Sequence, residues 1–149
     1  MSTQPAVTLE RVESWLTGED LVFEHDDEGD IMVGFENCYF AFYMQAEGEL
    51  LLARAYWRGR FPVGQMPELH DLADAHHQKT YGPRLSVLTS PGEEGQDSAI
   101  LGTQMVEYVA QGRSDEQLAA FMDLVMRMNM RLFADIEERY PALVTWGDD

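Results

Sequence analysis

The sequence predicts an α+β fold in which helices pack on one antiparallel sheet. Several strand-like segments are separated only by short polar turns, as in antiparallel hairpins, whereas parallel strands need long crossover connections. Three other segments carry apolar residues every three or four positions, which is typical of amphipathic helices. The expected order is helix, four strands, helix, two strands and a long helix (α-β-β-β-β-α-β-β-α).

The first helix is expected close to the amino terminus. Thr8 is a good N-cap residue and Gly18 is a typical helix stop. Between them, Leu9, Val12 and Leu16 recur at helical spacing. We therefore expect a short amphipathic helix that buries one face.

Four strands are expected to follow as a meander. Each is rich in β-branched, aromatic or alternating apolar residues, and turns rich in Asp, Glu and Gly separate the members of each pair. Consecutive strands joined by such turns pair as neighbours. The expected strands cover residues 21–25, 31–36, 38–45 and 50–59.

A second helix, two further strands and a long helix complete the prediction. Pro67 suits the first turn of the second helix, and Gly82 with Pro83 ends it. Ser114 and Gln117 form a capping-box pattern at the start of the long helix. The two strands cover residues 84–90 and 98–110, and the long helix covers residues 114–140.

The length of the chain favours a single domain. A chain of 149 residues can bury about 68 to 70% of the surface that its unfolded form exposes. No linker, repeat or low-complexity tract interrupts it. We expect one domain over residues 1–149, with flexible tails at 1–7 and 142–149.

The composition narrows the classes of partner and location. The formal net charge is −17 and 45% of the residues are hydrophobic, which suits a folded acidic protein. Such a charge repels phosphate backbones and anionic lipids, so we expect neither nucleic acid nor a membrane as partner. Without a signal sequence or an apolar run of about 18 residues, the expected location is cytoplasmic. Cys38, the single cysteine, is expected to be a small buried residue.

The sequence contains no pattern with a catalytic mechanism. Its serines and threonines lack a nucleophile elbow, and its glycines do not form a phosphate-binding loop followed by lysine. No pair of carboxylates stands out as acid and base. We therefore predict a non-enzymatic protein without a cofactor.

Two segments carry more apolar side chains than packing on one surface requires. Apolar residues cover well over half of the long helix, where a half-buried helix needs about a third. On the third strand neither face is polar, so both should be covered. This surplus predicts a polypeptide partner and a homodimer, although methionines that fill the core, and helices on opposite sides of the sheet, are the alternatives. The expected contact residues are Tyr39, Tyr43, Met122, Met126, Met130 and Phe133.

A row of arginines on the fourth strand is a candidate anion site. Arg54, Arg58 and Arg60 fall on alternate positions with Tyr56, so all project from one face. Guanidinium groups bind carboxylates, phosphates or acidic peptides. The alternative is that these arginines pair with the carboxylates of the chain itself.

A second candidate site lies on the second helix. His70, Asp74 and His77 have the i, i+4, i+7 spacing that places them along one side, as two ligands of a zinc ion would be. A structural zinc site needs about four ligands, so a solvated face with His76 turned toward the core is the alternative. The alternative function is a small-molecule or metal-ion sensor with a pocket between the sheet and this helix.

Two stretches resemble the YbjN family of bacterial proteins. They are residues 34–42, GFENCYFAF, and residues 129–133, NMRLF. Together with the order of elements, the resemblance extends over residues 9–140. It implies a fold like that of type III secretion chaperones and a chaperone-like or regulatory role in sensory transduction, which means protein binding rather than catalysis. The family pattern brings no catalytic residue to this chain.

Overall fold

The elements follow one another in the predicted order, with one short strand added. The computed structural model describes residues 4–80, 82–92 and 95–146. Its helices are α1 (Leu9–Gly18), α2 (Met66–Lys79) and α3 (Asp115–Arg139). Its strands are β1 (Glu24–His25), β2 (Ile31–Gly34), β3 (Cys38–Gln45), β4 (Leu50–Trp57), β5 (Phe61–Pro62), β6 (Arg84–Ser90) and β7 (Ser98–Tyr108). Short 3-10 turns at Val63–Gln65 and Pro141–Leu143 precede α2 and follow α3.

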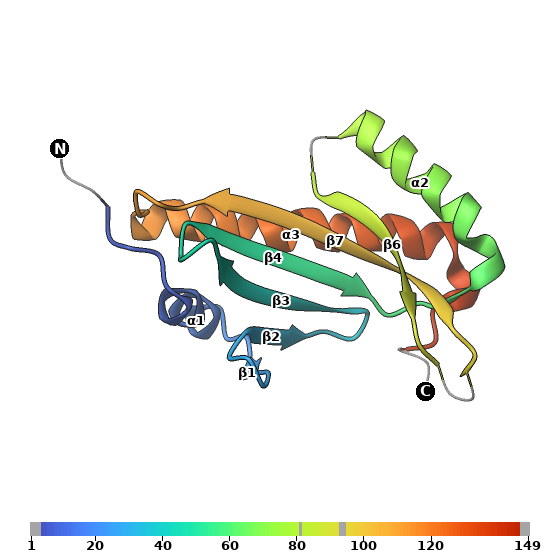
Figure 1. Cartoon of the computed structure of the whole chain (residues 1–149), viewed down its shortest axis with the longest axis horizontal. Coiled ribbons are helices and arrows are strands. Elements are labelled where there is room, and N and C mark those ends of the chain that lie inside the picture. Colours follow the sequence, from blue (N-terminus) through green and yellow to red (C-terminus); the bar gives the residue numbers. More distant parts are fainter. Residues whose placement is uncertain (1–3, 81, 93–94, 147–149) are drawn as a thin grey trace.

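The described strands form one antiparallel sheet (Figure 1). β1, β2, β3 and β4 make the predicted meander, and β7 lies on the other side of β4. β7 is long enough to pair with β4 and β5 along one edge and with β6 along the other. The two-residue β5 is the strand that the sequence did not predict, because so short a segment has no detectable periodicity.

The bounds of β3 and β6 are those predicted, and the other predicted strands end or begin at different residues. β1 is shorter than predicted, since Leu21 and Phe23 pack against the core instead of pairing with β2. β4 ends at Trp57, where the chain turns and places Gly59 under the indole ring. A Cβ at Gly59 would collide with that ring, so the turn requires glycine.

All three helices pack on the same face of the sheet. Figure 1 shows α3 running behind β4 and β7, along the length of the sheet. One continuous core joins buried residues of each helix, such as Val12, Leu69 and Val125, to the inward side chains of β3 and β4, such as Phe40 and Ala55. The alternative in which the first and the long helix lie on opposite sides is therefore wrong. None of the described helices combines the length and the apolar character that crossing a membrane requires.

A buried polar contact attaches the middle of α3 to the sheet. Asn129 is the buried amide of the helix, and its Oδ1 accepts a hydrogen bond from the hydroxyl of Thr103 on β7. The Nδ2 of Asn129 donates to the carbonyl oxygen of Val125 at 2.8 Å. Because a buried polar group without a partner is costly, this contact favours one position of α3 along β7.

Polar contacts also hold the two ends of α3. The Oε2 of Glu137 accepts hydrogen bonds from Asn37 Nδ2 at 2.7 Å and from Trp57 Nε1 at 3.0 Å. At the start of the helix, Arg11 of α1 donates to Asp115 Oδ1 at 2.8 Å. The helix is thereby tied to α1, to β4 and to the β2–β3 turn.

The local helix signals act as predicted. The hydroxyl of Thr8 accepts a hydrogen bond from the amide of Arg11 at 3.3 Å and caps α1. Ser114 and Gln117 exchange reciprocal bonds of 2.8 and 3.1 Å and form the capping box of α3. These bonds satisfy amide groups that a helix start leaves without partners.

The described parts of the predicted tails pack on the body of the protein. Near the amino terminus, Val7 is buried and the carbonyl of Pro5 accepts a hydrogen bond from the amide of Arg113 at 3.0 Å. Near the carboxyl terminus, the indole of Trp146 lies edge-on to that of Trp57, with ring centroids 5.6 Å apart. The outer parts of both predicted tails, residues 1–3 and 147–149, lie outside the described residues.

Replacing Asn129 by alanine should lower the free energy of unfolding by about 1 to 3 kcal/mol, because Thr103 would be left without its buried partner. Urea denaturation followed by tryptophan fluorescence measures the change. Arg127→Ala is the control: it removes an exposed ion pair with Asp123 on the same helix and should cost less than about 0.5 kcal/mol. Equal unfolding midpoints for Asn129→Ala and the wild type would contradict the role given to this contact.

Candidate functional site

The face of the sheet opposite the helices is uncovered in the described part of the chain. We call it the open face. Its apolar members include three of the exposed large hydrophobic side chains among the described residues: Leu88 at 38%, Val106 at 46% and Tyr108 at 54%. Strand register and side-chain alternation define its positions on the four longest strands. They are Tyr39, Ala41, Tyr43, Gln45, Leu50, Leu52, Arg54, Tyr56, Arg84, Ser86, Leu88, Ser90, Ser98, Ile100, Gly102, Gln104, Val106 and Tyr108.

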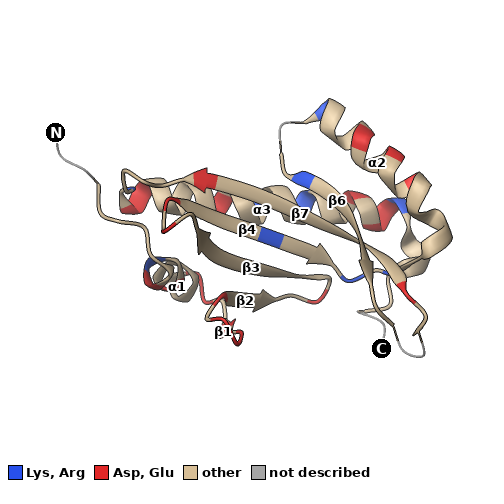
Figure 2. Ribbon diagram, viewed as in Figure 1, with Lys and Arg blue, Asp and Glu red and all other residues tan. Residues whose placement is uncertain are grey.

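The open face differs in charge from the rest of the protein. None of its positions on these four strands is Asp or Glu, although the chain has 27 such residues. Figure 2 shows acidic segments on the three helices, on the β1–β2 hairpin and near strand ends, and a basic segment in the middle of β4. Asp26, Glu28 and Asp30 of the β1–β2 hairpin border this face, because they line a hollow of about 490 Å³ together with Tyr39, Tyr43, Arg54 and Tyr56. The open face is therefore a basic and apolar surface within an acidic molecule.

Arginine and tyrosine side chains interleave on this face. The rings of Tyr39 and Tyr56 stack with centroids 4.9 Å apart. The guanidinium of Arg54 lies 5.6 Å from the Tyr43 ring, and that of Arg58 lies 5.3 Å from the Tyr39 ring. Both distances are in the range of cation–π attraction. We call these five residues the arginine–tyrosine patch.

The arginines of this region form hydrogen bonds with groups other than carboxylates. Arg54 Nε donates to Gln104 Oε1 at 3.2 Å, and Arg58 Nε donates to the carbonyl of Phe35 at 3.0 Å. Arg60 lies beyond the end of β4 and donates to Ser90 Oγ at 3.1 Å. Among the described residues, no carboxylate lies within 4.0 Å of these three guanidinium groups. The expectation that they pair with carboxylates of the chain itself is therefore wrong for the described residues.

The protonation of the patch suits binding rather than nucleophilic chemistry. Burial raises the pKa of the Tyr39 hydroxyl, Tyr56 raises it further, and Arg58 lowers it in part. Burial likewise raises the pKa of Tyr43, against the opposing effect of Arg54. The pKa of Arg54 is raised, chiefly by its hydrogen bond with Tyr56. At neutral pH these shifts keep the hydroxyls of Tyr39 and Tyr43 neutral and the guanidinium of Arg54 charged.

The register adds a residue that the sequence could not place. Arg54 pairs with Gln104 of β7, and Gln104 pairs on its other side with Arg84 of β6. Arg84 is therefore a further exposed cation of the open face, on the far side of Gln104 from Arg54. Only the strand order β4–β7–β6 brings it there, since 30 positions separate Arg54 from Arg84 in the sequence.

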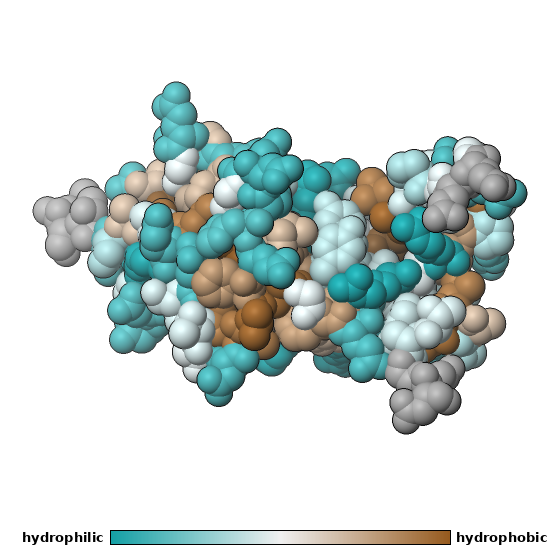
Figure 3. All heavy atoms as spheres, turned by 90° about the horizontal axis from the view of Figure 1, so that it is seen from below, coloured by the Kyte–Doolittle hydropathy of each residue, from teal (hydrophilic) through white to brown (hydrophobic). Residues whose placement is uncertain are grey.

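The contacts predicted on the long helix are less available than those on the sheet. Met122 and Phe133 are completely buried in the core, so within this fold they offer no surface to a partner. Met126 and Met130 are partly buried and pack against the same core. Most apolar side chains of α3 therefore pack inside this chain and are not available to a partner. Figure 3 nevertheless shows apolar patches between hydrophilic side chains on one side of the molecule.

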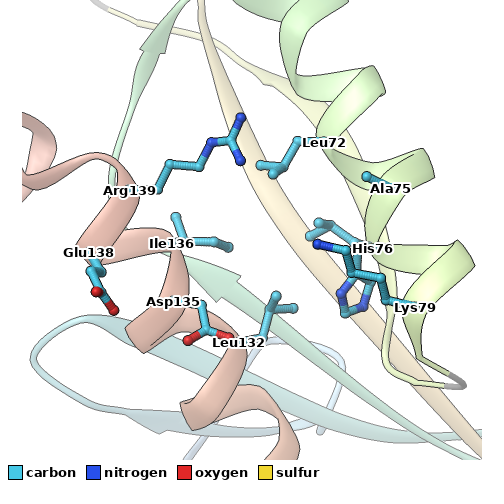
Figure 4. A pocket seen from close by; sticks show the side chains of 10 residues that line it. Leu72, Ala75, His76, Lys79, Leu132, Asp135, Ile136, Glu138 and Arg139 are labelled. Atoms are coloured by element: carbon cyan, nitrogen blue, oxygen red, sulfur yellow. The ribbon is translucent and has the colours of Figure 1, made fainter.

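A groove lies between α2 and the last turns of α3 (Figure 4). It has a volume of about 400 Å³ and joins a neighbouring hollow of about 410 Å³ through shared residues. Its walls are apolar and its rim carries both charges. The lining residues are Leu72, Ala75, His76, Lys79, Leu85, Leu132, Asp135, Ile136, Glu138 and Arg139. The sequence predicted a pocket between the sheet and the second helix. This groove lies instead between α2 and α3, and neither the arginine row nor His70 and His77 line it.

The candidate metal ligands of α2 do not converge. His70 and Asp74 are exposed, and His77 Nε2 accepts a hydrogen bond from the amide of Leu85 at 2.9 Å. This bond attaches α2 to the start of β6. His76 is half-buried, as expected for a residue turned toward the core, and lies 2.7 Å from the carbonyl of Pro83. Among the described residues, no group of three or more His, Cys, Asp or Glu side chains is arranged to hold a metal ion.

Sequence and structure comparisons agree with this fold. The model of the YbjN family, described as "Putative bacterial sensory transduction regulator", matches residues 8–138. The chain is also similar to the crystal structure of YbjN, described as a putative transcription regulator from E. coli, with a TM-score of 0.67 and 12% sequence identity. That match covers 93% of this chain and 96% of the other. At this identity the likeness concerns the fold. No curated protein matches the sequence.

The thiol of Cys38 should be unreactive in the folded protein. Burial raises its pKa to about 12, with a smaller rise from Glu137 that opposes the effect of Arg58. Since the thiolate is the reactive form, we expect a thiol reagent at pH 8 to modify folded Cys38 at least about a hundredfold more slowly than the urea-unfolded chain. Equal rates in the two states would contradict this burial.

Proposed function

Because this chain belongs to the YbjN family, we propose that it is a bacterial, cytoplasmic regulator that acts by binding a polypeptide on its open face and catalyses no reaction. The observation that carries the proposal is the layering of the fold. Three helices share one face of the sheet, and the other face is left with exposed apolar and aromatic side chains.

The extent and composition of the open face support this role. The face runs across four strands, and its aliphatic pairs Leu52–Val106 and Leu88–Ile100 lie on opposite sides of the row formed by Arg54, Gln104 and Arg84. Stable protein interfaces bury about 800 Å² on each partner, and tyrosine and arginine are enriched in them. A surface of this kind fits a polypeptide better than it fits a small molecule enclosed in a pocket.

The predicted contact residues divide between two surfaces. Tyr39 and Tyr43 lie on the open face, and we assign the partner to this side. Met126 and Met130 lie on one flank of α3 and form the competing surface. Leu124, which is 40% exposed, lies on the other flank of the helix. The homodimer is assigned to a surface other than the open face, because two facing copies would bring like-charged arginines together. Light scattering of the free protein tests the homodimer separately.

The absence of catalysis rests on the chemistry of the candidate groups. Buried Cys38 and the neutral hydroxyls of Tyr39 and Tyr43 are poor nucleophiles, since their pKa values are all raised. The arginines of the patch stay protonated and cannot serve as bases. These groups suit recognition of a partner and do not provide an acid–base pair.

Two exposed leucines give a matched test of the binding surface. Leu88 is on the open face and Leu124 is on α3, with 38% and 40% exposure. We expect Leu88→Asp to reduce the recovery of a crosslinked polypeptide from native cells at least about tenfold, because it buries a charge in the interface. Leu124→Asp should leave recovery unchanged. Circular dichroism checks that both variants fold.

The opposite result assigns the partner to α3. Loss of the crosslinked polypeptide only with Leu124→Asp, or equal recovery with both variants, would contradict the proposed role of the open face.

A second candidate function is a small-molecule sensor that uses the groove between α2 and α3. The observation that favours it is a groove volume of about 400 Å³, within the range of about 300 to 1,000 Å³ of small-molecule pockets. The apolar walls and the charged rim suit a compound with an apolar body and a charged group. The screen described next also includes divalent metal ions, although the histidines of α2 do not converge.

A thermal-shift screen over anions, nucleotides and divalent metals tests this second function. A ligand at 100 times its Kd should stabilise the fold by about 2.7 kcal/mol. Ala75→Trp should abolish the shift, because Ala75 is an exposed lining residue and tryptophan would fill the groove. Ala120→Trp, at an exposed alanine of α3 outside the groove, is the control. A shift that survives Ala75→Trp would place the ligand elsewhere.

A further inference from the structure

The charge pattern of the open face indicates the chemistry of its partner. Carboxylates are concentrated on the other surfaces of the protein and are missing from the open-face positions of β3, β4, β6 and β7. In a chain of net charge −17, this distribution makes one face attractive to acidic groups that the rest of the surface repels. Opposite charge across an interface guides association and excludes wrong partners.

The patch holds its guanidinium groups in place before any partner arrives. Arg54 is fixed by the Tyr43 ring and by Gln104, and Arg58 is fixed by the Tyr39 ring and by the carbonyl of Phe35. Both arginines donate these bonds through Nε, and no carboxylate among the described residues pairs with either. Ordering a flexible side chain opposes binding, so arginines that are already ordered bind carboxylates at lower entropic cost.

A third cation extends the basic surface across the sheet. Arg84 and Arg54 flank Gln104 in register, so two strand spacings, or about 10 Å, separate their backbones. Arg58 follows Arg54 by four residues, which is about 13 Å along an extended chain. A single small anion cannot reach three cations spread over this distance. A polypeptide segment with several carboxylates can.

The apolar neighbours indicate that the partner is not uniformly acidic. Leu88 lies beside Gly102 and the Tyr56 ring. Because Gly102 has no side chain, the sheet surface is hollowed at this point. Val106 and Tyr108 form a second exposed apolar area farther along β7, beyond Gln104. An extended segment places alternate side chains on one face, and it can present acidic and apolar groups in turn.

We infer that the open face recognises an extended acidic segment of a partner protein, in which carboxylates bind Arg54, Arg58 and Arg84 and apolar side chains pack on the tyrosines and Leu88. This inference rests on the proposed function, because it specifies the polypeptide that the open face binds. Arg84 is the residue that it adds to the predicted arginine row.

Three labelled synthetic peptides test the inference by fluorescence anisotropy. Each is about 12 residues long, which spans roughly 40 Å when extended, and alternates valine with glutamate, glutamine or lysine. We expect the glutamate peptide to bind at least about tenfold more tightly than the glutamine peptide and to weaken with added salt, and the lysine peptide not to bind.

Arginine variants locate the binding. The double variant Arg54→Gln with Arg84→Gln should bind the glutamate peptide at least about tenfold more weakly. Its affinity for the glutamine peptide should change less than about twofold. The control pair Arg127→Gln with Arg131→Gln alters the net charge equally but lies on α3, on the helix side of the sheet. It should leave both affinities unchanged.

Three outcomes overturn the inference. Equal affinity for the glutamate and glutamine peptides would mean that the open face does not select acidic segments, and the proposed function would stand. Binding of none of the peptides also overturns it, while the capture experiment with Leu88→Asp decides the proposed function independently. A wild-type dimer that the variant Arg54→Gln with Arg84→Gln converts to a monomer would identify a second copy of this chain as the occupant.

Discussion

The position of α3 along one face of the sheet is the constraint on which the other features depend. The helix crosses the sheet lengthwise and buries Met122, Val125 and Phe133 against it. Hydrophobic burial supplies most of the stabilisation but specifies position poorly, since apolar contacts are not directional. The contact of Asn129 with Thr103 and the bonds accepted by Glu137 are directional. They favour one register of the helix on β7 and β4.

Helices gathered on one face leave the other face of the sheet uncovered, and this asymmetry separates two chemistries. Acidic segments lie on the helices, on the β1–β2 hairpin and near strand ends. The open face carries arginines held by tyrosine rings, with aliphatic residues beside them. An α+β layer of this kind therefore has a natural recognition surface wherever its second face is not hydrophilic. The groove between α2 and α3 arises separately, because α2 packs on β6 and stays apart from α3.

The candidate site could be predicted in part from the sequence. Alternation along a strand was enough to place Arg54 with Tyr56, and Tyr39 with Tyr43, on shared faces. It was not enough to distinguish a covered face from an open one, so Met122 and Phe133 were predicted as contacts although they are core residues. The same limit left Arg84 unassigned and gave His77 the appearance of a metal ligand, when it instead accepts a backbone hydrogen bond from β6.

The sequence by itself determined the α+β class, the order of the helices and longer strands, the helix caps and the acidic character of the protein. These features depend on neighbouring residues, on hydrophobic periodicity and on composition, all of which can be read along the chain. Only the tertiary structure decided the pairing of β7 with both β4 and β6, the shared side of the three helices and the open face that results. Such features depend on contacts between residues far apart in sequence, and local periodicity gives each amphipathic segment a buried side without identifying its partner.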